Sequence, residues 1–346
     1  MDTVPTIFVD AVIGLLSQSS LVSVAEMADP LWKNIGEEHA KNRIYFDMKI
    51  GVIDGNLAFS FLETTVISSS LELRRPVEPR EIERISPRYW RIASVNGFVG
   101  SLRGFVSLAI QYNHLLLVEE DAFHKTLLQF SKQIEQPGRL LALKQPVSTA
   151  SVARMRMRLP FIGTLNLKQE DLLTLSLMTI RAFRKRAYFN DVSIPYVGPE
   201  SADFLRDHIY NHPHLSSIAL NEDWPPSILE DLKQFLRKGL RRSVELPMTV
   251  RIDDEFVMEL FEVWKRDGEF ECTLAYELPH EAPQELLDLM TKFDEKTFHL
   301  KHENRKSAVI VIHQNALYRR CELRFVKCSC GVSNATCEWN ASLHEL

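Results

Sequence analysis

The sequence predicts a mixed α/β fold in which short strands alternate with helices along most of the chain. Short apolar pairs at alternate positions recur, as in Leu165–Leu167, and each is followed by a polar turn and a helix-like stretch. Aligning the second apolar residue gives intervals of 27, 26 and 26 residues at Leu167, Ile194, Leu220 and Leu246. A fixed period in this range is typical of stacked strand–helix units, and it predicts a mainly parallel sheet with helices on one side.

Residues 1–42 form the first predicted segment, which is helical. Its apolar residues keep mostly three- and four-residue spacings, as expected for one face of a helix, at Phe8, Val12, Ile13, Leu16, Leu21, Val24 and Met27. Trp32 follows Pro30. Proline is favoured in the first turn of a helix, so a further short helix is expected to begin there.

Residues 43–99 predict a β-hairpin and then an irregular linker. Apolar residues alternate with polar ones over 44–50 and over 57–61, which is typical of half-buried strands. Asp54-Gly55 lies between them and is a strong hairpin-turn signal. Residues 63–98 are expected to be irregular because they are highly charged in part and contain three prolines, Pro76, Pro79 and Pro87.

Residues 100–306 contain the predicted strand–helix array. In its best-formed unit, residues 215–220 supply the strand, Trp224-Pro225-Pro226 the turn and Gly239 a cap at the end of the helix. The apolar series extends less regularly to Leu274, Leu300, Leu143 and Ile110. No single unit can bury its own apolar face, so neighbouring units must stack to form the core.

Residues 307–346 are expected to close the array. Residues 309–313 and 320–327 are strand-like, and the second stretch alternates well between apolar and charged side chains. We therefore expect a C-terminal capping hairpin followed by a tail. Capping is physically required because an open terminal strand invites pairing with other chains.

The composition argues against nucleic-acid-binding, membrane-spanning and disulfide-rich secreted proteins. The net charge of −5 gives no electrostatic reason to expect nucleic acid or an anionic membrane as a partner. No apolar run approaches the roughly 18 to 20 residues of a membrane span, and the N-terminus lacks the basic flank of a secretory signal. The five cysteines are odd in number and lie beyond residue 271, a poor disulfide framework. We expect an intracellular protein, in the cytoplasm or nucleus.

No motif for catalysis is present: the sequence lacks a phosphate-binding glycine loop, a nucleophile elbow and a zinc-protease helix. Four thiols could surround zinc, but their spacings of seven, two and seven residues are unlike those of zinc knuckles, which favours structural or tail thiols at Cys321, Cys328, Cys330 and Cys337. His208, His212 and His214 include an i, i+4 pair, but Pro213 stops the helix and no acidic ligand completes the set. We expect no enzyme, metal or cofactor.

One dense basic cluster comprises Arg181, Arg184, Lys185 and Arg186. It could bind an acidic partner or act as a nuclear import signal. The favoured interpretation is the solvent-exposed last turn of a helix, where basic side chains are common.

The most specific local pattern lies in the first 32 residues. An aliphatic–proline pair is followed by helical apolar residues, at Val4, Pro5, Phe8, Val12, Ile13 and Leu16. This arrangement resembles the opening of the F-box, and Leu21, Val24 and Trp32 occupy approximately the positions of its second apolar helix and its tryptophan. With the hairpin and the array, the whole chain resembles a nematode-expanded family of F-box-like, leucine-rich-repeat-like proteins. Ile7 departs from the pattern, because the F-box usually carries an acidic residue there.

The resemblance implies a protein-interaction module that acts as a substrate receptor of a cullin–RING ubiquitin ligase. Its partners would be the adaptor subunit of the ligase, bound through the residues of the F-box-like pattern, and a target protein held by the repeat array. An alternative is a repeat-scaffold interaction protein with no link to ubiquitin ligases, in which the N-terminal helices only cap the array.

Overall fold

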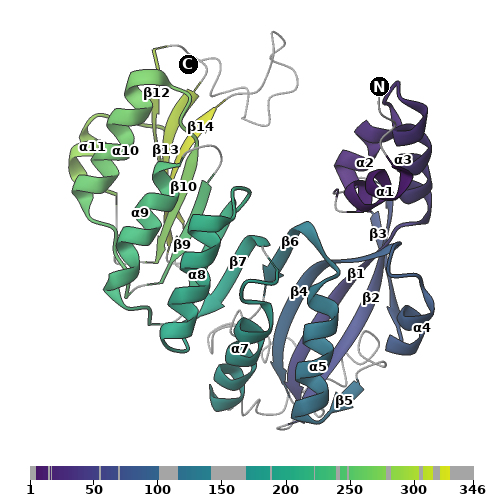
Figure 1. Cartoon of the computed structure of the whole chain (residues 1–346). Helices are drawn as coiled ribbons and strands as arrows, with labels where there is room; N and C mark the ends of the chain where they lie inside the picture. Colours follow the sequence, from purple (N-terminus) through teal and green to yellow (C-terminus); the bar gives the residue numbers. More distant parts are fainter. Residues whose placement is uncertain are drawn as a thin grey trace. The chain divides into compact units, whose positions relative to one another are not determined.

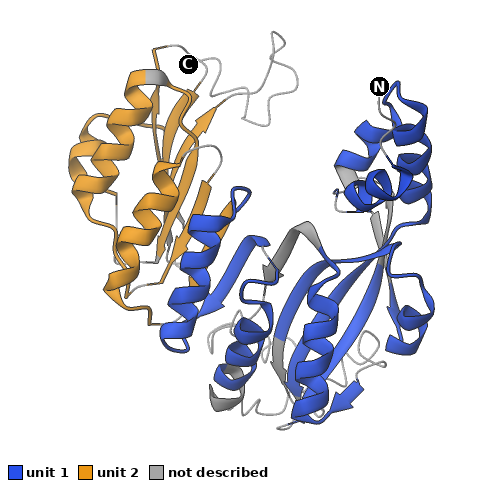
Figure 2. Ribbon diagram, in the orientation of Figure 1, with its two compact units in different colours: residues 1–215 blue, residues 216–346 orange. Residues whose placement is uncertain are grey.

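The computed structural model of the chain divides into two compact units, residues 1–215 and 216–346 (Figures 1 and 2). This boundary falls inside the segment that the sequence assigns to one continuous array. The structure describes residues 5–14, 16, 18–53, 56–68, 71–100, 116–141, 169–187, 189–221, 223–238, 242–247, 249–277, 282–303, 307–314 and 320–327. Five residues of the predicted repeat pattern, Ile110, Leu143, Leu165, Leu167 and Gly239, lie outside these ranges, as does the Asp54-Gly55 turn.

Unit 1 begins with three helices, as the sequence predicts. They are α1 (Thr6–Gly14), α2 (Gln18–Ala25) and α3 (Pro30–Asn42). The third begins at Pro30 because the Asp29 side chain accepts hydrogen bonds from the backbone N–H groups of Leu31 and Trp32. The three helices share a small apolar core of their own, built from Val9, Ile13, Leu21, Val24 and Ile35.

The predicted N-terminal hairpin is confirmed: β1 (Ile44–Ile53) pairs antiparallel with β2 (Asn56–Ser68). Residues 63–98 are more regular than predicted. They include β3 (Leu71–Val77), α4 (Pro79–Arg84) and most of β4 (Trp90–Gly100), which pairs parallel with β1. The prolines do not prevent this, because Pro76 lies on β3, whose described pairing is with β2 alone, and Pro79 occupies the first turn of α4.

The remainder of unit 1 alternates strands and helices. After β5 (Leu116–Val118), the elements are α5 (Glu120–Ser131), β6 (Ile134–Leu141), α7 (Gln169–Phe183), β7 (Phe189–Pro195) and α8 (Pro199–Asn211). Strands β4, β6 and β7 pair in parallel, and the order of the sheet is β7-β6-β4-β1-β2-β3. Helices α5 and α7 lie on one face of this sheet (Figure 1), above the buried side chains of Phe46, Met48 and Ile50.

Unit 2 opens with the best example of the predicted strand–helix pattern. Its parallel strands are β8 (Ser217–Asn221), β9 (Arg242–Leu246) and β10 (Cys272–Glu277). The 3-10 turn η2 (Pro226–Ile228) and α9 (Leu229–Arg237) connect β8 to β9, and α10 (Asp254–Asp267) connects β9 to β10. Ile218 lies opposite Val244, which matches the predicted interval. Leu246 lies opposite Tyr276 rather than Leu274. The longer α10 accounts for this shift, since it has 14 residues and α9 has 9.

The C-terminal part of unit 2 is antiparallel. It consists of α11 (Gln284–Asp288), β11 (Thr291–Lys292), β12 (Thr297–Lys301), β13 (Ser307–Gln314) and β14 (Arg320–Lys327). The expected C-terminal hairpin is confirmed as β13 and β14. The parallel series does not continue to Leu300, because β12 pairs antiparallel and β14 takes the place beside β10. Burial explains why β14 rather than β12 lies beside β10. The apolar residues of β14 are buried, namely Cys321, Leu323 and Phe325, whereas Phe298 and Leu300 of β12 are only half-buried.

Within the described residues no helix is both long enough and apolar enough to cross a membrane. Each unit contains both parallel strands, which are connected by helices, and an antiparallel edge: β1-β2-β3 in unit 1 and β10-β14-β13-β12-β11 in unit 2.

Candidate protein-interaction site

The three N-terminal helices contain most of the residues of the F-box-like pattern, but they use them in different ways. Val9 and Ile13 of α1 point into the shared core and are fully buried. Ile13 is therefore a core residue rather than a surface contact. Leu16 is half-buried and packs against the same core. Val4 lies outside the described residues.

Other apolar residues of this segment face outwards. Phe8 is 55% exposed and Pro5 is exposed, whereas Val12 is half-buried. Phe8 and Val12 lie four positions apart on α1 and so share one face of the helix. Three further residues, which the sequence pattern did not single out as contacts, are also exposed: Ile7 (80%), Val22 (57%) and Met27 (43%). We call Pro5, Ile7, Phe8, Val12, Val22 and Met27 the apolar surface.

The sequence contains a signal for this surface. Helix α1 reads Thr-Ile-Phe-Val-Asp-Ala-Val-Ile-Gly, with apolar residues all round its circumference. A helix on the surface of a globular protein normally buries one stripe, so the apolar residues outside that stripe must be exposed or covered by a partner. Val9 and Ile13 take the inward stripe, and Ile7 and Phe8 remain outside it.

A close approach of helices fixes the core beneath this surface. Gly36 of α3 faces α2, and a Cβ atom at this glycine would lie 2.8 Å from Cγ1 of Val24 and 3.3 Å from the backbone nitrogen of Ala25. Any larger residue at position 36 would push α2 away from α3. The glycine therefore sets the spacing of the two helices.

Two arginines hold the carboxyl end of α1. Arg43, which follows α3, donates hydrogen bonds to the carbonyl oxygens of Leu16 and of Ile13, the latter at 3.0 Å. Arg91 of β4 donates to the carbonyl oxygen of Gly14 at 2.6 Å. The last carbonyl groups of a helix lack partners within the helix and carry partial negative charge, so guanidinium groups satisfy both their hydrogen bonds and their electrostatics.

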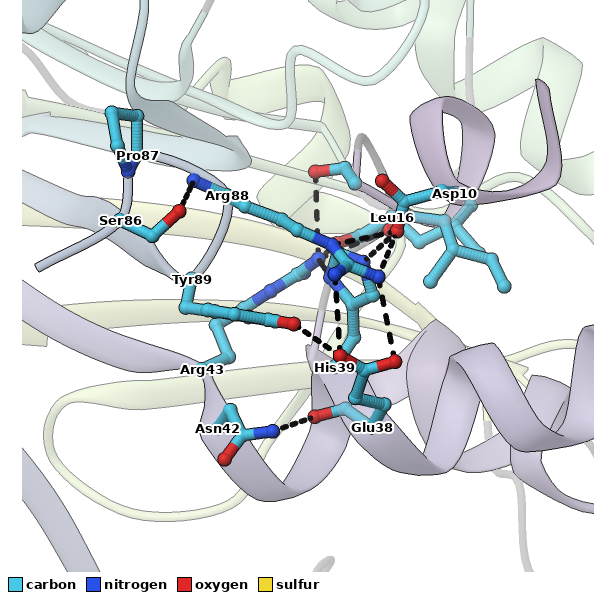
Figure 3. Close-up of polar contacts among 12 residues, drawn as sticks. Asp10, Leu16, Glu38, His39, Asn42, Arg43, Ser86, Pro87, Arg88 and Tyr89 are labelled. Atoms are coloured by element: carbon cyan, nitrogen blue, oxygen red, sulfur yellow. Dashed lines mark hydrogen bonds and ion pairs between the residues drawn. The ribbon is translucent and has the colours of Figure 1, made fainter. Parts of the chain in front are cut away.

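A polar cluster formed by Asp10, Glu38, His39, Arg43, Arg88 and Tyr89 continues this contact (Figure 3). Asp10 of α1 accepts hydrogen bonds from His39 Nε2 at 2.8 Å and from Arg88 Nε at 2.8 Å. Arg88 also donates to Glu38 of α3 at 3.2 Å, and the Tyr89 hydroxyl donates to the same carboxylate. The cluster joins α1 and α3 to the turn before β4.

The pKa directions in the cluster follow from its contacts. Burial lowers the pKa of His39, and the neighbouring Arg43 lowers it further, whereas the hydrogen bond to Asp10 opposes both effects. Partial burial raises the pKa of Asp10, but its bonds to His39 and Arg88 together outweigh burial and hold it below its usual value. Asp10 therefore remains an anion between two basic groups, and burial favours the neutral form of His39.

A second candidate surface is the sheet face of unit 2 that lies opposite its helices. Val244, Leu274 and Leu323 are buried and lie opposite one another in register, on the face where Phe325 of β14 contacts Trp264 of α10. The described helices of this unit lie on one side of the sheet (Figure 1). The other face carries small or polar residues in adjacent register positions, including the half-exposed Ser243 and Thr273. Further along it, Glu322 and Arg324 of β14 form an ion pair of 2.8 Å.

The candidate metal residues have other contacts. His208 Nδ1 lies 2.9 Å from the carbonyl oxygen of Phe204, and His212 Nε2 lies 3.0 Å from Oδ1 of Asn190. Burial lowers the pKa of His208 to about 4. Cys321 is buried on β14. The other three candidate thiols, Cys328, Cys330 and Cys337, lie outside the described residues. Over the described ranges, no three histidine, cysteine or acidic side chains gather as metal ligands would.

The basic cluster at the end of α7 contacts the following helix. Arg181 donates to Glu200 at 2.7 Å and Arg184 to Asp203 at 3.1 Å, both on α8. In unit 2, Lys233 and Arg237 of α9 form equivalent ion pairs with Asp253 and Glu259 at α10. Arg181, Lys185 and Arg186 are exposed at or just after the end of α7, as the favoured interpretation expects, and the links of Arg181 and Arg184 to α8 go beyond it.

The most developed site is thus the three-helix segment, with an apolar surface outside, a small core beneath it and polar anchors to the sheet of unit 1. Comparison with known proteins adds no further assignment: no protein-family model, curated protein or solved structure matches the chain.

Proposed function

We propose that the chain is a substrate receptor of a cullin–RING ubiquitin ligase, which docks on the adaptor subunit of the ligase through its three N-terminal helices. The observation that carries the proposal is the apolar surface. Ile7, Phe8, Val22 and Met27 are large, apolar and exposed within one small segment that already has a complete core. Large apolar side chains left exposed in a segment whose core is complete favour an interaction site.

The strand–helix units would hold the target protein. We propose that they form a leucine-rich-repeat-like array, supported by the parallel order of β8, β9 and β10 and by the ion pairs between consecutive helices. The target would bind the sheet face that carries Ser243 and Thr273, because these two residues are half-exposed and the described helices of unit 2 lie on the other side of the sheet.

Such a receptor lowers no reaction barrier itself. It binds the ligase and the target at the same time, inside the cell, and so converts ubiquitin transfer into a reaction between neighbours. The gain is the effective concentration produced by linking two binding surfaces. This mechanism needs no metal, cofactor or catalytic side chain.

Co-purification of the chain with the adaptor subunit tests the proposal. Phe8→Glu places a charge in the apolar surface without touching the core, and loss of an aromatic anchor costs about 2 kcal/mol or more, roughly a thirty-fold increase in Kd. Leu289→Glu is the matched control, because Leu289 is 53% exposed and lies in unit 2. Adaptor binding that is absent in the unmodified chain, or equal in Phe8→Glu and the unmodified chain, contradicts this docking surface.

The alternative function, a repeat scaffold without a ligase link, is favoured by the contacts of Arg43 and Arg91 with α1, since an end cap would also be tied to the sheet. It predicts that a chain starting at residue 43 aggregates, because its sheet loses a required cover. A truncated chain that is soluble and folds cooperatively, while losing only adaptor binding, argues for the receptor instead.

A further inference from the structure

The hydrogen bonds around His39 form a closed path that begins and ends on α1. Asp10 of α1 contacts His39 Nε2 at 2.8 Å, and His39 Nδ1 lies 3.1 Å from Nη2 of Arg43. The same Arg43 nitrogen reaches back to the carbonyl oxygen of Ile13 at 3.0 Å. Figure 3 shows His39 at the centre of this path. One imidazole ring therefore connects the middle of α1 to the guanidinium that holds its end.

This geometry fixes the protonation state of the ring. A guanidinium group can only donate hydrogen bonds, so Nδ1 of His39 must accept from Arg43. The proton of the neutral ring must then be on Nε2, from which it is donated to Asp10. A second proton would be placed on Nδ1, where it would face the donor group of Arg43.

The groups around the ring come from three elements. Asp10 faces it from α1, Glu38 and Arg43 belong to α3 and its end, and Arg88 and Tyr89 belong to the turn before β4. The Tyr89 ring packs edge-on against the imidazole at 5.5 Å. Protonation would strengthen the bond to Asp10 but bring a charge into a fully buried position beside two guanidinium groups. Burial is the larger effect, and it lowers the pKa of His39.

We infer that His39 is a proton-sensitive latch, which holds α1 while its ring is neutral and releases the end of α1 when the ring takes up a proton. Protonation removes the acceptor that orients Arg43, and Arg43 then loses its hold on the carbonyl groups of Ile13 and Leu16. Because α1 carries Ile7 and Phe8, its release would also disperse the apolar surface. Only the effect on the apolar surface, as a binding surface, rests on the proposed function. The release of α1 itself would occur in the free chain, without a partner.

Amide hydrogen exchange of α1 in the full chain tests the latch. Exchange is measured from about pH 7.5 to about pH 5.5 and corrected for the intrinsic rates. When the open form binds one more proton than the closed form, the opening equilibrium rises by up to about tenfold per pH unit below about pH 6.5. We expect this rise in α1. Opening of α1 that is independent of pH would overturn the inference.

Two substitutions separate the latch from general acid sensitivity. In His39→Gln, the side-chain amide can accept from Arg43 and donate to Asp10 without binding a proton, so the pH dependence of α1 should disappear. His124→Gln, on α5, is the matched control and should keep it. Asp10→Asn removes the anion that favours the protonated ring in the closed form, so the rise should still begin near about pH 6.5 but continue to lower pH before it levels off. An unchanged rise in His39→Gln, or a rise that levels off at the same pH in Asp10→Asn as in the unmodified chain, contradicts the latch.

Adaptor binding is measured separately over the same pH range. If the proposed function holds, affinity falls as α1 opens, and His39→Gln restores it at low pH. If the adaptor does not bind at any pH while α1 exchange keeps its dependence on His39, the latch stands and the ligase proposal fails.

Discussion

Two isoleucines on one helix offer the sharpest test of how the N-terminal segment works. Ile13 is fully buried in the core of the three helices, whereas Ile7, on the same helix, is 80% exposed. We predict that Ile13→Ala strongly destabilises the segment and that Ile7→Ala leaves it stable. If the apolar surface binds a partner, Ile7→Ala should weaken binding while the segment stays folded, whereas Ile13→Ala can weaken binding only by destabilising the segment.

The magnitude follows from burial. Ile→Ala removes three carbon groups, which is worth about 2.4 kcal/mol at about 0.8 kcal/mol each, and the cavity left in the core raises the cost to about 3 to 4 kcal/mol. At Ile7 the side chain already contacts solvent, so the change in stability should stay within about 0.5 kcal/mol. The two substitutions should therefore differ by about 3 kcal/mol.

Hydrogen exchange of the peptides that cover α1 to α3 measures this difference. A loss of about 3 kcal/mol lowers protection by about two orders of magnitude, since each 1.4 kcal/mol is about tenfold. A local measurement is needed because a chain with two compact units does not unfold in one step. If Ile7→Ala loses as much protection as Ile13→Ala, then Ile7 is covered in the native chain and the apolar surface does not exist as described.

Three further outcomes are expected. Arg43→Met should lower protection of α1 by about 2 kcal/mol, because it removes charge-assisted hydrogen bonds to carbonyl groups, whereas Arg75→Met, at an exposed ion pair, should cost less than about 1 kcal/mol. Gly36→Ala should destabilise α2 and α3 by about 1 kcal/mol in the same experiment, since crowding against Val24 outweighs the better helix propensity of alanine. The stability of unit 1 should fall by about 3 kcal/mol between pH 6.5 and 4, because His208 has a pKa of about 4 when folded and the unfolded chain binds the proton first. Hydrogen exchange of peptides from unit 1 at several pH values measures this slope, which should flatten in His208→Gln.

Local patterns predicted the local elements of this chain well. Helix spacing in residues 1–42, the alternation that marks β1 and β2, and the proline-led start of α3 each depend on neighbours in sequence, and each is present. The interval between Ile218 and Val244 was also correct, because a strand–helix unit of fixed length returns the chain to the same register. The interval failed at β10, where a longer helix intervenes.

The candidate site was only partly accessible to the same reasoning. The F-box-like pattern located α1, but spacing alone did not separate Ile13, which is buried, from Phe8, which is exposed. The polar anchors could not be found in this way. Arg88 lies 78 positions from its partner Asp10, and Arg91 lies 77 positions from its partner Gly14.

The sequence by itself determined that this chain alternates strands with helices, that the described part of its first 42 residues is mainly helical and that residues 307–314 and 320–327 pair as a hairpin. Tertiary structure decided which strand lies beside β10 and which side of α1 is left exposed. The physical reason is that periodicity records which residues of an element are apolar, whereas the choice of neighbour depends on the total area buried. Cys321, Leu323 and Phe325 of β14 are buried more completely than Phe298 and Leu300 of β12, and it is β14 that lies beside β10.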